Sequence, residues 1–257
     1  MSVGVVAPLL GALMLSVTYF ISRYTHAIEM KFRRRWLSFA AGVSVAYAFV
    51  DILPELEVQR RVLQEVGVAG AVFVEQRIYL FVLLGFLVFH GLARLGSMES
   101  EKDTTPSGRL GWSPLFTLQM TSFVLYNMVV GYLLLSRSAA GVRVLTLFVF
   151  AMMLHLIVLD HELVRQYGIR YASRGRVALA LGVPAGVLLG MTGGIVEGLF
   201  PRMFALVAGG VVMTSAGAEV PREREGRYWY FVMGAVLYTI FLLYSQGNVL
   251  RDIRQGT

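Results

Sequence analysis

The sequence has no cysteine and few charged residues for its length. Lys, Arg, Asp and Glu make up 15% of the 257 residues, whereas hydrophobic residues make up 56%. The absence of cysteine excludes disulfide bonds and thiolate metal ligands. The shortage of charge, together with the hydrophobic excess, is typical of a chain buried in lipid and not of a domain surrounded by water. The sequence therefore predicts an integral membrane protein.

Further absences from the sequence narrow the range of possible functions. The first residues, MSVGVVAPLL, lack the positively charged start of a secretory signal peptide, so we interpret them as the start of a membrane span. The net charge of +7 comes mainly from arginines that lie between apolar runs, which predicts membrane topology and not binding to nucleic acid. No GxSxG or HExxH motif is present. We therefore do not expect an enzyme.

Eight apolar segments occupy most of the chain, each long enough to cross ~30 Å of hydrocarbon as a helix. No other stretch is long enough to form a separate soluble domain, so we expect a single transmembrane domain over residues 1–257, of the all-α class. The segments are Gly4–Ser22, Trp36–Pro54, Arg77–Leu95, Pro114–Leu135, Arg143–His161, Val177–Val196, Arg202–Pro221 and Tyr228–Gln246.

Lysine and arginine are unevenly distributed between alternate loops. Of the 23 residues, 15 lie on the side reached after spans one, three, five and seven, and 8 lie in the other loops and the tails. The richer side is expected to be cytoplasmic, which places both termini outside the plasma membrane. The cluster from Lys31 to Arg35 then marks the inner end of span two, and residues 96–113 form a flexible cytoplasmic loop.

Spans two and seven share a pattern. When Ala41-Gly42 is aligned with Ala208-Gly209, Pro54 falls on Pro221 without a gap. Because an odd number of steps separates the two spans, they run in opposite directions, which predicts an inverted repeat of the kind that many secondary transporters contain. The halves are residues 1–95 and 177–248, with the central helices within residues 114–161 between them.

Glycines in span six predict close helix packing. Gly182, Gly186 and Gly190 follow one another at four-residue spacing. Such a stripe of small residues lets the backbone of another helix approach closely.

Polar side chains inside the spans are expensive in hydrocarbon, so we expect them to face the interior of the bundle. Asn127 in span four and His155 in span five fall at similar depth on adjacent antiparallel spans, and they could meet. Amide oxygen and neutral imidazole are ligands for Zn²⁺ and related ions. The alternative is that Tyr126, Asn127 and His155 form hydrogen bonds between helices.

A second set of candidates consists of charged or titratable residues nearer the ends of the spans. As stations on an ion path they are Asp51, Asp160, His161 and Glu162. The three contiguous residues from Asp160 to Glu162 point around a helix instead of converging, and near the interface such side chains reach water. We therefore expect a solvated helix end in preference to a ligand set.

Three stretches resemble a known family. AAGVSVAYAFVDILPE resembles the second span of ZIP family metal transporters, AGGVVMTSAGAEVPRE is similar to the seventh, and GFLVFHGLARL is similar to the third. The resemblance implies eight spans in a three-two-three inverted repeat with both termini outside. It also implies that a divalent metal such as zinc is the transported ion. The partners expected are the lipid bilayer, a metal cation and a second copy of the chain in a homodimer.

The chain departs from the ZIP family at the motifs of spans four and five. His-Asn-x-x-Glu-Gly reads here as the sequence from Tyr126 to Gly131, and His-x-x-Pro-Glu-Gly reads as the sequence from His155 to Asp160. Asn127, Gly131 and His155 match the motifs, but Val130 and Leu159 replace the two glutamates.

The loss of these glutamates leaves two hypotheses for the function. Two neutral ligands cannot replace the negative charge that a divalent cation needs in a medium of low dielectric constant. The chain is either a divergent ZIP-like transporter of metal cations with a degenerate transport site, or a non-transporting scaffold or sensor with the ZIP fold. We expect tight zinc binding at mid-membrane to be absent or much weakened.

Overall fold

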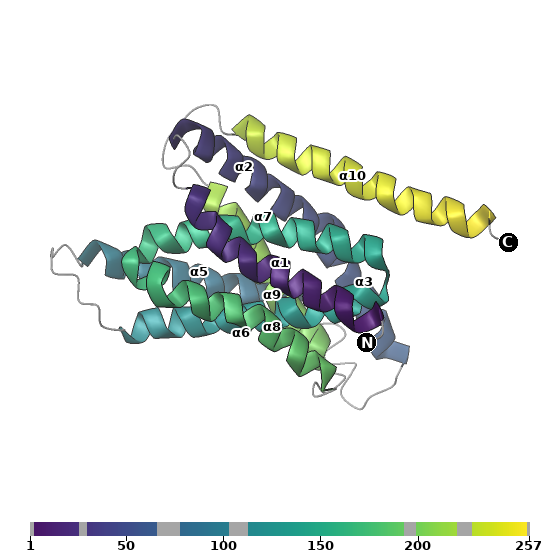
Figure 1. The fold of residues 1–257 in the computed structure, drawn as a ribbon, viewed down its shortest axis with the longest axis horizontal. Helices are drawn as coiled ribbons and strands as arrows, with labels where there is room; N and C mark the ends of the chain where they lie inside the picture. The colour runs from purple at the N-terminus through teal and green to yellow at the C-terminus, as the bar shows by residue number, and fades with distance from the viewer. Residues whose placement is uncertain are drawn as a thin grey trace.

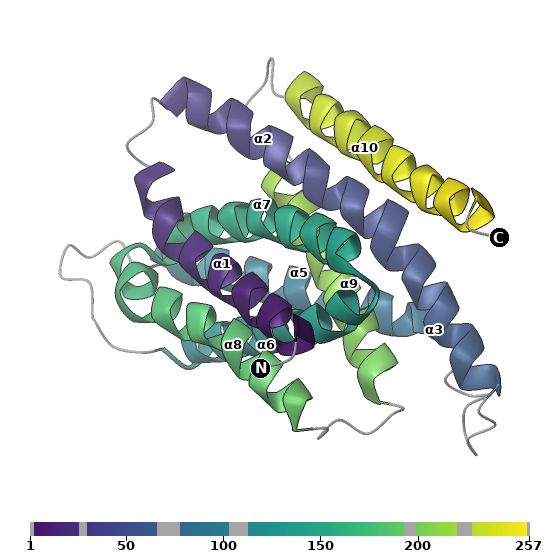
Figure 2. The ribbon, with the colours of Figure 1, turned by 45° about the vertical axis from the view of Figure 1, so that its right-hand side comes forward.

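The computed structural model describes residues 3–25, 30–65, 78–102, 113–192, 199–219 and 228–255, and these residues form an all-helical bundle (Figures 1 and 2). The predicted all-α class is confirmed. The elements are α1 (Val3–Thr25), α2 (Met30–Tyr47), the π-helical turn η1 (Ala48–Ile52), α3 (Leu53–Glu65), α5 (Ile78–Lys102), α6 (Pro114–Ala139), α7 (Val142–Tyr167), the π-helical turn η2 (Tyr171–Gly175), α8 (Arg176–Met191), α9 (Leu199–Glu219) and α10 (Tyr228–Gln255).

Among the described residues, six helical stretches are long and apolar enough to cross a membrane, which supports a multi-pass membrane protein. They are Val6–Tyr24, Phe32–Val58, Ile78–Gly96, Pro114–Ala139, Val142–Tyr167 and Tyr171–Met191. The other two predicted spans lie on α9 and α10, where the described apolar stretches are Pro201–Thr214 and Tyr228–Tyr244.

Several helices extend beyond the predicted apolar segments. α7 ends at Tyr167 and not at His161, and α5 ends at Lys102 and not at Leu95. The start of the predicted flexible loop 96–113 is therefore helical, and its residues 103–112 lie outside the described part of the chain. Hydropathy locates only the lipid-facing part of a helix, whereas polar turns at its ends still form helical hydrogen bonds.

The helices form two groups. α1, α6, α7 and α8 pack against one another, and in the second group α2 pairs with α10, α5 pairs with α9, and α2 also contacts α9. The groups meet chiefly where α2 packs on α7. α10 lies along α2 at the edge of the bundle in both views (Figures 1 and 2), and α1 begins at the end of the bundle where α10 finishes (Figure 1).

Glycine lets α2 and α10 touch through their backbones. A Cβ atom added to Gly42 would lie 2.1 Å from the carbonyl oxygen of Phe231, and one added to Gly234 would lie 2.2 Å from that of Phe39. Both distances are far below van der Waals contact, so any larger residue would push the two helices apart.

The same reciprocal crossing joins α5 to α9. A Cβ atom on Gly85 would lie 2.1 Å from the carbonyl oxygen of Leu206, and one on Gly209 would lie 1.9 Å from that of Val82. The two pairs of helices in the second group are therefore held by one kind of contact.

The close packing predicted for the glycine stripe of span six is also confirmed. A Cβ atom on Gly186 would lie 1.9 Å from the carbonyl oxygen of Met128 on α6, and one on Gly131 of α6 would lie 1.9 Å from that of Val183. Gly182 and Gly190 also face α6. Pro184 lies inside α8 without ending it.

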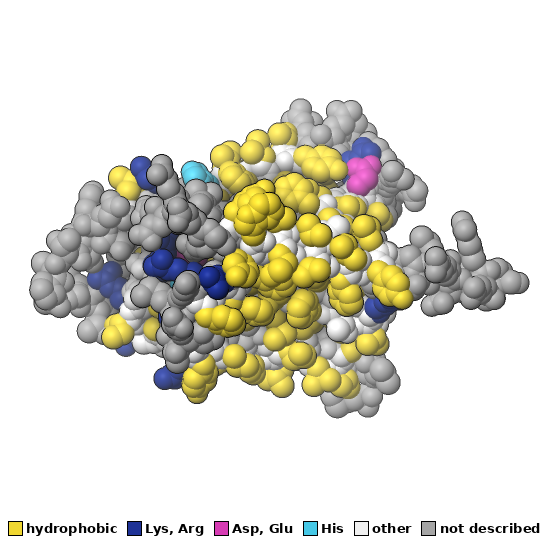
Figure 3. Space-filling view, turned by 90° about the horizontal axis from the view of Figure 1, so that it is seen from above, with side chains coloured by type: hydrophobic (Ala, Val, Ile, Leu, Met, Phe, Trp, Pro, Cys, Tyr) yellow, Lys and Arg dark blue, Asp and Glu magenta, His cyan; other side chains and the backbone are white. Residues whose placement is uncertain are grey.

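The outer surface is largely apolar. Figure 3 shows a face dominated by hydrophobic side chains, with most of the visible arginine and lysine toward one end and fewer toward the other. On α10 the side chains of Leu237, Ile240 and Phe241 are each more than half exposed. A large exposed apolar surface of this kind is typical of helices that face lipid, because the surface of a soluble monomer rarely presents so much contiguous apolar area.

Candidate functional site

Asn127 lies on α6 at the centre of the bundle and is fully buried. Its side-chain oxygen accepts a hydrogen bond of 2.9 Å from the hydroxyl of Tyr19 on α1, and its amide nitrogen donates one of 2.9 Å to the carbonyl oxygen of Phe123. The amide oxygen that would bind a metal therefore already joins α1 to α6.

His155 on α7 is also buried and is bonded to a tyrosine. Its Nε2 lies 2.9 Å from the hydroxyl of Tyr126 on α6. The ring of Phe89 on α5 meets Tyr126 edge to face, with 5.8 Å between the ring centroids. The predicted hydrogen bond between helices is thus confirmed for this histidine, while Asn127 is bonded to a different tyrosine.

Asp160 is not at a solvated helix end, and that prediction is wrong. Its side chain is fully buried and accepts two hydrogen bonds from Arg176, at 2.9 Å from Nε and 3.0 Å from Nη2. The hydroxyl of Tyr171 donates a third, at 2.6 Å. The error has a physical cause, because α7 continues to Tyr167 and the chain then returns through η2, which brings Tyr171 and Arg176 over the carboxylate.

The other two residues of that run lie apart from Asp160. His161 and Glu162 are half-buried, and Glu162 forms an ion pair with Arg165, one turn later on α7. The guanidinium of Arg165 is exposed. As expected, the three contiguous residues do not converge on one point.

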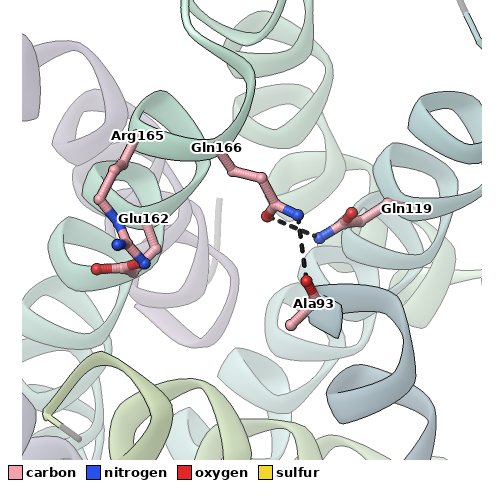
Figure 4. A network of polar contacts seen from close by, with 5 residues as sticks. All are labelled: Ala93, Gln119, Glu162, Arg165 and Gln166. Carbon is pink, nitrogen blue, oxygen red and sulfur yellow. Dashed lines mark hydrogen bonds and ion pairs between the residues drawn. The ribbon is translucent and has the colours of Figure 1, made fainter. Parts of the chain in front are cut away.

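A network of amides joins three helices close to this end of α7 (Figure 4). Gln166 accepts a hydrogen bond of 3.4 Å from Gln119 on α6 and donates one of 3.4 Å to the carbonyl oxygen of Ala93 on α5. The hydroxyl of Tyr167 donates to Gln119 as well. Gly96 leaves the room for these side chains, since a Cβ there would lie 1.8 Å from Nε2 of Gln166.

Asp51 lies inside the π-helical turn η1 and faces an arginine from α6. Its Oδ2 is 3.3 Å from Nη2 of Arg137, and the carboxylate of Glu55, four residues on, is 3.6 Å from Nη1. The guanidinium also lies over the ring of Phe148 on α7, 6.0 Å from its centroid. By its position after span four Arg137 was expected in a loop, but it is only 7% exposed.

The side-chain groups that could bind a metal ion are therefore already bonded to other side chains of the protein. Arginine holds the carboxylates of Asp51 and Asp160, and tyrosine holds Asn127 and His155. In the described part of the chain no group of three or more His, Asp or Glu side chains is placed to hold a metal ion.

No protein-family model matches the chain, and no curated protein sequence matches it. The ZIP resemblance therefore depends on the residues of spans two, three and seven quoted above.

The sequence did not single out several residues of the interior, and four of them are partners of the predicted candidates. They are Tyr19, Arg137, Tyr171 and Arg176. A usable signal existed for the arginines, since a carboxylate inside a span needs a cationic partner, and Arg137 and Arg176 adjoin apolar segments. The tyrosines gave no comparable signal, because a neutral hydroxyl group does not require a partner of opposite charge.

Proposed function

We propose that the chain is a multi-pass membrane scaffold or sensor with a ZIP-like arrangement of helices, and that it does not carry divalent metal through its centre. The observation that carries this proposal is the occupation of the interior carboxylates by arginine. Asp160 accepts both hydrogen bonds of a bidentate guanidinium, and Asp51 faces a second guanidinium. A fixed side-chain cation thus stands where a transported cation would need negative charge.

The centre of the bundle offers little to a divalent ion. An ion at Asn127 and His155 would break the bonds of both residues to tyrosine, and Val130 and Leu159 supply no negative charge. Dehydrating a divalent ion in a medium of low dielectric constant costs far more than two neutral ligands return. This balance favours the scaffold or sensor over the transporter.

The glycine crossings support the ZIP-like repeat. Gly209 follows Gly42 by 167 positions, and Leu206 follows Phe39 by the same 167. The partner helices obey a second constant shift: Gly234 follows Gly85 by 149 positions, just as Phe231 follows Val82. These four glycine contacts of spans two and eight and of spans seven and three correspond pairwise, and this correspondence supports an inverted three-two-three repeat.

Zinc binding and transport test the proposal. We expect the purified protein to retain far less than one zinc per chain after dialysis, and liposomes containing it to take up zinc no faster than empty ones. The double variant Val130→Glu with Leu159→Glu should raise binding because it restores the carboxylates. Val130→Gln with Leu159→Gln is the control of equal size without charge. Near-stoichiometric zinc in the wild type, lost on His155→Ala, would overturn the proposal that the centre does not hold divalent metal, and faster zinc uptake by the protein-containing liposomes would favour the transporter.

Topology provides a separate test. We place the protein in the plasma membrane with both termini outside, on the basis of the arginine distribution. Single cysteines introduced at Ser2 and at Gly256, both outside the described residues, should each react with an impermeant thiol reagent on intact cells. The native chain has no cysteine to interfere. Labelling at only one terminus would contradict an even number of spans.

A further inference from the structure

The ion pair at Arg137 coincides with a break in the regular geometry of span two. Ala48–Ile52 form a π-helical turn closed by a hydrogen bond from the backbone N–H of Leu53 to the carbonyl oxygen of Ala48. Pro54 follows at once and has no N–H to donate, so a regular α-helical bond to Val50 cannot form there. A π-helical turn contains one extra residue, which rotates the helix beyond it by about 100° relative to an uninterrupted α-helix.

The two acidic residues that Arg137 binds lie within and just beyond this turn. Asp51 belongs to η1, and Glu55 belongs to the first turn of α3. Both approach one guanidinium, at 3.3 Å and 3.6 Å. Arg137 comes from the last turn of α6, so the ion pair joins the two groups of helices at the position where span two changes its rotation.

Neither feature is explained by stability alone. A buried ion pair usually adds little net stability because removing the charges from water costs as much as their attraction returns. π-helical turns are rare and occur mostly at functional positions. The buried ion pair and the π-helical turn occur at the same point of span two, which indicates that the ion pair maintains the turn.

We propose that Arg137 is a clamp that holds the π-helical turn and thereby fixes the rotation of α3. When the attraction is lost, the extra residue of η1 is no longer held in place, and α3 turns about its axis by up to about 100°. Beyond η1, α3 packs mainly on α9, and its Leu56 is fully buried whereas Val58 is 53% exposed. The turn moves Leu56 out of its buried position. This inference does not depend on the proposed function.

Thiol labelling tests the clamp directly, because the chain has no cysteine of its own. The reporter is Leu56→Cys, and its rate of reaction with a maleimide is measured in purified protein. The test variant combines Asp51→Asn, Glu55→Gln and Arg137→Met, which removes all three charges together, so that none of the three is left buried without the other two. We expect at least tenfold faster labelling of the reporter in this variant than in the otherwise native chain.

Two controls make the outcome decisive. Leu179→Cys on α8, which is also fully buried, reports general loosening and should label slowly in both backgrounds. Val58→Cys should label rapidly in both. The charge exchange Asp51→Arg with Arg137→Asp, combined with Glu55→Gln so that no carboxylate faces the new aspartate, should return the Leu56→Cys rate toward the native value. An unchanged rate at Leu56 in the neutral variant, or equal acceleration at Leu179, would overturn the clamp.

Discussion

Two buried ion pairs lie in the described bundle, and they differ in geometry and in what they join. Asp160 and Arg176 meet through two hydrogen bonds, with Tyr171 as a third donor, between neighbouring elements of one group of helices. Arg137 instead meets Asp51 and Glu55 at 3.3 Å and 3.6 Å and joins two groups of helices.

The difference indicates that burial of a charge does not by itself define its role. The carboxylate of Asp160 is fully buried, so its charge depends wholly on the three donors around it. The side chains of Asp51 and Glu55 are only partly buried, at 18% and 31% exposure, and their contacts with Arg137 are longer than the hydrogen bonds between Arg176 and Asp160. Separating Asp160 from Arg176 is therefore expected to cost more free energy than separating Arg137 from Asp51 and Glu55.

The largest expected effect is at Asp160. Asp160→Asn leaves the buried guanidinium of Arg176 without its counter-charge, and removing one partner of a buried pair costs about 3–5 kcal/mol of the free energy of unfolding. Denaturation by sodium dodecyl sulfate in mixed micelles, followed by circular dichroism, measures it. The matched variant Asp51→Asn should cost clearly less because its carboxylate is partly exposed. Equal losses would erase the distinction between the two pairs.

A smaller effect is expected from the tyrosines. Tyr171→Phe removes a hydrogen bond to a charged carboxylate, worth about 1.5–3 kcal/mol. Tyr126→Phe removes a bond to the ring of His155, which within a membrane is worth about 0.6 kcal/mol on average. The same denaturation assay ranks the two variants. A larger loss at Tyr126 would indicate that the histidine site, and not Asp160, is the more tightly constrained centre.

Replacing each arginine by lysine separates bidentate binding from simple charge attraction. Arg176→Lys loses one of two hydrogen bonds to Asp160, a loss of about 1.5–3 kcal/mol for a bond to a charged group. Arg137→Lys should cost less than Arg176→Lys, because a point charge can still attract two carboxylates that lie 3.3 Å and 3.6 Å from the guanidinium. The free energies of unfolding of the two variants check this. A costlier Arg137→Lys would show that the planar guanidinium is needed at η1.

The helical class and the approximate positions of the spans could be predicted from the sequence for a simple reason. Runs of apolar residues about 20 long have few alternatives to membrane helices, so composition predicted the class and the approximate spans. The helix ends were not accessible, as α7 shows by continuing from His161 to Tyr167. The π-helical turn at Asp51 was also not predicted, because Pro54 alone is compatible with a kink or an ordinary helix end as well.

The candidate site was predicted only in part. Asn127 and His155 were selected because polar side chains in a span must find partners, and they do. Their actual partners, Tyr19 and Tyr126, depend on how the helices are rotated and packed, which periodicity does not determine. Asp160 was misplaced for the same reason, since its partner Arg176 lies 16 residues away across a turn.

The smallest expected effect concerns the ion pair between Glu162 and Arg165. Glu162 and Arg165 approach to 2.5 Å, closer than the ion pairs of Asp160 or Asp51, yet the side chain of Arg165 is 62% exposed. An exposed pair gains little from attraction in water and loses side-chain entropy, so Glu162→Gln should change the free energy of unfolding by at most about 1 kcal/mol. Raising the salt concentration should reduce even this difference, because solvent ions screen exposed charges and reach buried ones far less. The assay is therefore run for Glu162→Gln and Asp160→Asn at low and high salt. A loss at Glu162 that matches the loss at Asp160 and persists in high salt would mean that distance, and not burial, determines which ion pair matters.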